Sequence, residues 1–151
     1  MSSSQLNIRP LAGLGALNFG MSMQDIVDIL GQPDDSEVLS DGEDEVETLI
    51  WNYWKRGISL FIEGAENSVL SNFETDNTDA ILFGKKVFEL DEDEITALMK
   101  ENGFSTCDID VETWGEKRLS FEDAQIDFYF DKGTLVTVNW GVVVNDKGEI
   151  V

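Results

Sequence analysis

One short stretch of the chain contains the start, the body and the end of an amphipathic helix. Ser22 is placed as an N-cap, because its side chain can accept a hydrogen bond from the backbone near Asp25, three residues later. Apolar residues then recur at helical spacing, at Met23, Ile26, Val27 and Leu30. Gly31 and Pro33 are typical of a helix end. The sequence therefore predicts a helix over residues 23–30, and any fold must bury its apolar side.

A second, looser copy of this pattern predicts a helix over residues 92–102, with Asp91 as its cap and an end at Asn102 and Gly103. Its apolar positions are Ile95, Leu98 and Met99. The acidic run 91–94 lies at the predicted N-terminus, where the helix dipole stabilises each negative charge by roughly 0.3–1 kcal/mol. A structural role is therefore the preferred interpretation of this run.

Between and after the helices, apolar and polar residues alternate with the period of two that β-strands have. Strands are predicted over residues 48–54, 58–63, 69–74, 109–113, 117–121, 125–130 and 135–140. The acidic residues 34–47 between the first helix and the first of these strands are predicted to form a solvated loop. The expected fold class is α+β: two tandem repeats of a helix plus an antiparallel meander, about 13–76 and 81–144, with the helices packed on one face of an antiparallel sheet. Residues 1–151 are expected to form a single domain.

The charge balance restricts the partners that the chain can have. It contains 31 Asp and Glu against 10 Lys and Arg and no histidine, for a formal net charge of −21. Such a surface repels nucleic acid and attracts cationic partners, although acidity also serves solubility. The sequence has no signal peptide or membrane span, which leads us to expect a cytoplasmic protein that binds no membrane.

We expect neither an enzyme, nor a metal site, nor a cofactor. Histidine-dependent general-base chemistry is excluded by composition, and neither acidic run has the ligand spacing of a calcium loop. Cys107 is the only cysteine, and with no histidine to activate it we interpret it as a half-buried structural thiol.

Aromatic residues on or beside the strands are the candidate anchors for a partner protein. The predicted partner-binding residues are Trp51, Tyr53, Trp54 and Trp140, together with the loop acids Asp41, Glu43, Asp44 and Glu45. Alternation places Trp51 and Tyr53 on one face of their strand, and either that face or the opposite one must point away from the helices. The competing interpretation is an aromatic core with one partly exposed ring.

The stretch from Phe19-Gly20-Met21-Ser22 through Ile26 to Leu30-Gly31 and Pro33, followed by an aromatic strand pair, resembles a known module. It is similar to the helix-and-meander repeat of the β-lactamase inhibitory proteins and of the small lipoproteins of outer-membrane assembly. The resemblance covers about 15 residues, and the second copy departs from it with Asn102-Gly103-Phe104. The resemblance implies a non-catalytic protein that binds other proteins across an exposed sheet face and its loops.

Together these features predict a non-catalytic binding protein. The leading hypothesis is an acidic immunity or inhibitor protein that occludes a cationic toxin or enzyme, with mimicry of nucleic acid as a variant. The alternative is a small-molecule-binding or self-associating structural domain with no inhibitory role. The sequence leaves the identity of the partner and the oligomeric state open.

Overall fold

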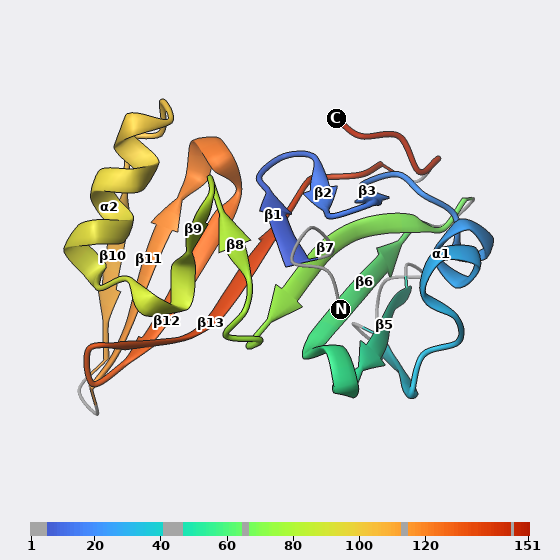
Figure 1. Cartoon of the computed structure of the whole chain (residues 1–151). Helices are drawn as coiled ribbons and strands as arrows, with labels where there is room; N and C mark the ends of the chain where they lie inside the picture. Colours follow the sequence, from blue (N-terminus) through green and yellow to red (C-terminus); the bar gives the residue numbers. More distant parts are fainter. Residues whose placement is uncertain (1–5, 41–46, 65–66, 113–114, 146) are drawn as a thin grey trace.

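The computed structural model describes residues 6–40, 47–64, 67–112, 115–145 and 147–151, and within them the chain forms two β-sheets (Figure 1). The long sheet is antiparallel and contains β4 (Asp35–Ser40), β5 (Glu47–Tyr53), β6 (Ile58–Glu63), β7 (Val69–Thr75), β10 (Asp108–Val111), β11 (Glu116–Phe121), β12 (Ile126–Asp131) and β13 (Thr134–Gly141). Across the sheet these strands follow the order β10-β11-β12-β13-β7-β6-β5-β4.

The short sheet joins the N-terminus to the middle of the chain. It contains β1 (Asn7–Arg9), β2 (Gly13–Leu14), β3 (Leu17–Asn18), β8 (Ile81–Leu82) and β9 (Lys85–Lys86), in the order β3-β2-β1-β8-β9. β1 pairs with β8 in parallel, and the other pairs are antiparallel. The helices are α1 (Met23–Leu30) and α2 (Glu92–Glu101), with 3-10 turns η2 (Trp54–Arg56), η3 (Val87–Glu89) and η4 (Glu122–Ala124).

The expected α+β architecture of two tandem repeats is wrong. The protein is a β-rich fold with 47% of residues in strands, 21% helical and two sheets. Two-residue strands such as β2 and β8 are too short for a period-two pattern to reveal them, so the short sheet was not predicted. The long sheet is also continuous: β13 pairs with β7, with Trp140 opposite Phe73.

Both predicted helices are confirmed, and their caps explain where they begin. The Ser22 hydroxyl accepts a hydrogen bond from the Asp25 amide at 3.2 Å, and Gly31 follows α1 with φ 81°. In α2, Asp91 accepts from the Glu94 amide at 2.8 Å, and Glu94 accepts from the Asp91 amide at 3.1 Å. This capping box gives the acidic run 91–94 the structural role that the sequence predicts.

The core lies on one face of the long sheet, against the short sheet and the apolar sides of α1 and α2 (Figure 1). Trp140 is fully buried at its centre, stacks on Phe73 with ring centroids 5.3 Å apart, and donates a hydrogen bond from its indole nitrogen to the Gly13 carbonyl at 2.9 Å. Because Gly13 belongs to β2, this bond connects the two sheets directly.

The acidic segment 34–47 is only partly the solvated loop that its charge predicted. Asp35–Ser40 form β4, the edge strand beside β5. The carboxylates of Asp35 and Glu37 both accept hydrogen bonds from the Asn52 side chain of β5, at 3.3 and 3.1 Å. A donor on the neighbouring strand thus offsets the repulsion that was expected to keep this segment out of the sheet.

Candidate functional site

The face of the long sheet that points away from the core is the candidate site, and we call it the open face. On β12 the residues Ile126, Phe128 and Phe130 are buried in the core, whereas the alternating Asp127 and Tyr129 are half-buried and point the other way. The strand registers carry this alternation across the sheet, so that Asp127 is opposite Asn139, which is opposite Glu74. The open face is therefore formed by alternating residues of the strands, and this alternation is interrupted where bulges shift the register, at Tyr129/Phe130 and at Phe61/Ile62.

Negative charge dominates the open face. Following the registers, its acidic strand residues include Asp35, Glu37, Glu63, Glu74, Asp108, Asp110, Glu116, Asp127 and Asp131. Among the strand residues that the structure describes, Arg118 is its one cation, and the guanidinium is ion-paired with the Asp110 carboxylate. The hydrogen bond that Arg118 donates to Asp110 raises the pKa of the guanidinium above its usual value. The face therefore has no described strand cation that remains unpaired.

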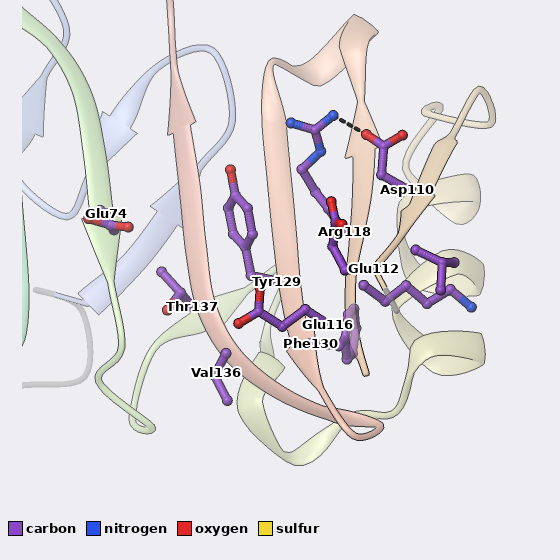
Figure 2. A pocket seen from close by; sticks show the side chains of 11 residues that line it. Glu74, Asp110, Glu112, Glu116, Arg118, Tyr129, Phe130, Val136 and Thr137 are labelled. Atoms are coloured by element: carbon purple, nitrogen blue, oxygen red, sulfur yellow. Dashed lines mark hydrogen bonds and ion pairs between the residues drawn. The ribbon is translucent and has the colours of Figure 1, made fainter. Parts of the chain in front are cut away.

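Two hollows lie side by side on the open face. The larger, with a volume of about 520 Å³, lies over β10 to β13 and is lined by Arg118, Tyr129, Val136 and Thr137 among others (Figure 2). The smaller, of about 340 Å³, lies over the ends of β5 to β7 and is lined by Asn52, Trp54, Ser59 and Thr75 among others. Glu74 and Thr137 line both, so the two hollows adjoin, and we refer to them together as the groove.

Glu74 lies where the two hollows meet. Burial raises the pKa of its carboxyl group, and the nearby Asp76 carboxylate raises it further. Within the described part of the chain, no side chain donates a hydrogen bond to this carboxylate. Burial also raises the pKa of the neighbouring Tyr129, with a smaller contribution from Asp127. A positive group bound here would relieve the unfavourable energy of the half-buried negative charge.

The structure places most of the predicted aromatic anchors in the core. Trp140 is 0% exposed and Tyr53 is 4% exposed, with its hydroxyl donating to the Gly31 carbonyl at 2.9 Å. Trp51 is opposite Leu60, so its half-buried ring packs on the core face. Of the four rings only Trp54, in η2, is 67% exposed, and it lies at one end of the groove. Tyr53 and Trp140 offer no surface to a partner, so these two predictions are corrected.

The predicted loop acids Asp41, Glu43, Asp44 and Glu45 lie outside the described residues. The open-face residues Glu74, Arg118 and Tyr129 were not among the predicted site residues. A usable signal existed for Tyr129, because alternation along β12 places it on the side opposite the apolar Ile126, Phe128 and Phe130. What the sequence lacked was the pairing of β13 with β7, which brings Glu74 to the same groove.

Three other features of the described residues are a free thiol, the possible metal ligands and the two helices. Cys107 is half-buried and unpaired, and burial raises the pKa of its thiol, which disfavours the nucleophilic thiolate. No group of three or more potential ligands in the described part of the chain could hold a metal ion. In the same residues, neither helix has the length and apolar character needed to cross a membrane.

Comparison with known protein families, curated proteins and solved structures finds no match to this chain. The resemblance to the β-lactamase inhibitory proteins and the assembly lipoproteins therefore stays a prediction. The functional argument rests on the geometry and charge of the open face.

Proposed function

We propose that the chain is a non-catalytic protein-binding protein of the cytoplasm, an acidic immunity or inhibitor protein that covers a cationic toxin or enzyme with its open face. One observation carries the proposal: a broad, hollowed sheet face has many carboxylates and, among its described strand residues, a single arginine that is already paired. Such a face complements a basic protein surface.

The proposed mechanism has two parts, attraction and occlusion. A net charge of −21 speeds the encounter with a cationic partner, and added salt screens this attraction because the Debye length is about 10 Å at 0.1 M. Once bound, the partner's basic side chains enter the groove near Glu74, and the exposed ring of Trp54 packs against its surface. Inhibition is then steric, because the open face covers the partner's own functional surface.

A small-molecule ligand is the competing occupant of the groove. The larger hollow falls within the range of roughly 300–1,000 Å³ that is usual for such sites. However, small-molecule sites are mostly apolar with few polar groups, whereas Glu74, Asp110, Glu112 and Glu116 all line this hollow. The acidic lining favours a polycationic protein surface over a small ligand.

The test begins with capture of the partner from the source organism's lysate at low salt, followed by reconstitution of the purified pair. Asp127→Lys reverses one charge on the open face, and Glu101→Lys makes the same charge change at the exposed end of α2. We expect Asp127→Lys to slow association and weaken binding at least tenfold, since a rim or face charge pair is lost and replaced by repulsion. Glu101→Lys should have a small effect.

The salt dependence of the association rate is a second test on the same purified pair. The association rate of the unmodified protein should fall steeply between 0.01 and 0.15 M salt, on the scale of roughly 30 to 8 Å in Debye length. Equal effects of the two substitutions would mean that only net charge matters, and the open face would lose its assigned role. An association rate indifferent to salt would remove the electrostatic mechanism.

A further inference from the structure

β10 is the outermost strand at one end of the long sheet, and no described element pairs with its outer side (Figure 1). The direction of its backbone groups follows from the pairing with β11. The Glu112 amide donates to the Glu116 carbonyl at 2.7 Å, so the residues of the same parity, Asp108 and Asp110, also direct their backbone groups toward β11. Ile109 and Val111 must then direct their amides and carbonyls outward, to the free side.

The side chains of β10 alternate in chemistry as well. Asp108 and Asp110 lie on the open face, because they are opposite Ser120 and Arg118. Ile109 and Val111 lie on the other face and are 55% and 69% exposed, although Ile109 is opposite the buried Leu119. An exposed edge with this much apolar surface is a template for pairing with another strand.

β10 has two of the usual protections of an edge strand, a length of only 4 residues and two aspartates, but other protections are absent. It contains no proline and no lysine, and its register with β11 runs without a bulge. Its charge instead decides which strand can pair with it. Two β10 strands could pair antiparallel with apolar residues opposite apolar residues. The same register would put aspartate opposite aspartate, and like charges directly opposite each other destabilise a strand pair. A net charge of −21 on each copy adds to this repulsion.

We propose that β10 accepts an extended segment of a partner protein by β-strand addition, and that this segment alternates lysine or arginine with apolar residues. Its basic side chains would lie beside Asp108 and Asp110 on the open face, and its apolar side chains beside Ile109 and Val111. Main-chain hydrogen bonds to Ile109 and Val111 supply the pairing, and the alternation supplies the selectivity. The inference goes beyond the proposed function, because the edge can accept a strand whether or not the groove binds a partner.

The probe is a capped peptide of about six residues that alternates lysine and valine, the usual length of a strand. Two control peptides keep its composition and charge: one groups the lysines together, and one carries N-methyl groups on the valine amides. Amide hydrogen exchange, followed by NMR on the full chain at low salt and at physiological salt, reports on the outward amides of Ile109 and Val111. We expect the alternating peptide to slow exchange at both by about tenfold, and both controls to leave it unchanged.

Three charge variants locate the bound peptide. Asp108→Lys alters the edge, while Glu101→Lys makes the same charge change on α2, so only the first should weaken binding of the alternating peptide by about tenfold. Asp127→Lys, in the open face, should weaken it less than Asp108→Lys does.

Three results would overturn the inference. The first is unchanged exchange at Ile109 and Val111 with the peptide bound, and the second is a larger effect from Asp127→Lys than from Asp108→Lys, which would place the peptide on the open face and away from the edge. The third is a dimer in light scattering that slows the same exchange without peptide, because the occupant would then be a second copy of the chain.

Discussion

Trp140 connects the two sheets, so replacing it by phenylalanine tests how the fold is held together. The substitution removes the indole donor to the Gly13 carbonyl at 2.9 Å and part of the ring that stacks on Phe73. A buried acceptor that loses its partner costs about 1–3 kcal/mol. The smaller ring leaves a void on the order of 40 Å³, which at roughly 24 cal/mol per Å³ adds about 1 kcal/mol. The free energy of unfolding should therefore fall by about 2–4 kcal/mol.

Urea unfolding followed by circular dichroism measures this loss without depending on tryptophan fluorescence. In a thermal scan the midpoint should fall by roughly 4–16 °C, since each kcal/mol shifts Tm by about 2–4 °C in a chain of this size. Trp54→Phe is the matched control, because it makes the same chemical change on a ring that is 67% exposed. Its effect should stay within about 0.5 kcal/mol of the unmodified protein.

Loss of the indole bond should also loosen one part of the structure before the rest. Without the indole bond, amide exchange should accelerate in β2 and its neighbours β1 and β3 before it does so in β12, which is buried among core residues of its own. Equal stability of Trp140→Phe and Trp54→Phe would refute the assignment of the indole bond as the link between the sheets. Loss of protection in β12 first would refute the order of opening.

Three further substitutions test other contacts. Tyr53→Phe removes the 2.9 Å bond to the Gly31 carbonyl and should lower the free energy of unfolding by about 0.5–1.5 kcal/mol in urea titrations; no loss would contradict it. Asp91→Ala removes one side of the α2 capping box and should cost about 0.5–2 kcal/mol, whereas the same change at Asp93, inside the helix, should cost less. The raised pKa of Glu74 stabilises the fold below its unfolded pKa, and this contribution is lost as pH rises through the folded pKa. Glu74→Gln should therefore gain stability relative to the unmodified protein as pH rises from about 4 to 7, and a difference independent of pH would count against the desolvation argument.

The sequence predicts the helices well because the signals that define them are local. Ser22 with Asp25, and Asp91 with Glu94, are pairs three residues apart whose hydrogen bonds depend on the helix alone. The strands of the long sheet, except β4, which was expected to be a loop, are likewise predicted by alternation within single segments. These predictions needed no knowledge of the rest of the fold.

Predictions that depend on distant contacts failed. The bond from Trp140 to Gly13 spans 127 residues, and the β13 to β7 pairing joins the two halves of the chain into one sheet. Neither leaves a trace in a short window of sequence. Without these two contacts, the simplest arrangement was two repeats with a helix packed on the sheet in each. The short sheet was therefore not predicted.

The position of Trp51 and Tyr53 was predictable from one additional step. In β6 the apolar Ile58, Leu60 and Ile62 alternate with Ser59, Phe61 and Glu63, which marks the core side of that strand. The hairpin through η2 sets Tyr53 opposite Ile58 and Trp51 opposite Leu60, on the same side. Strand register therefore transfers the core assignment from β6 to β5, and the aromatic anchors fall inside the fold.

The two surfaces proposed for partners meet at the same residues. Asp108 and Asp110 belong both to the open face and to the edge strand β10, and Asp110 lines the larger hollow together with Val111 and Glu112. A basic segment added beside β10 would extend the sheet, so its side chains would continue the open face and its cations would lie next to the groove. One cationic partner could thus occupy both surfaces at once, pairing its main chain at the edge while its neighbouring residues reach Glu74. The negative charge that disfavours pairing between two copies of β10 is then the same property that selects a basic partner.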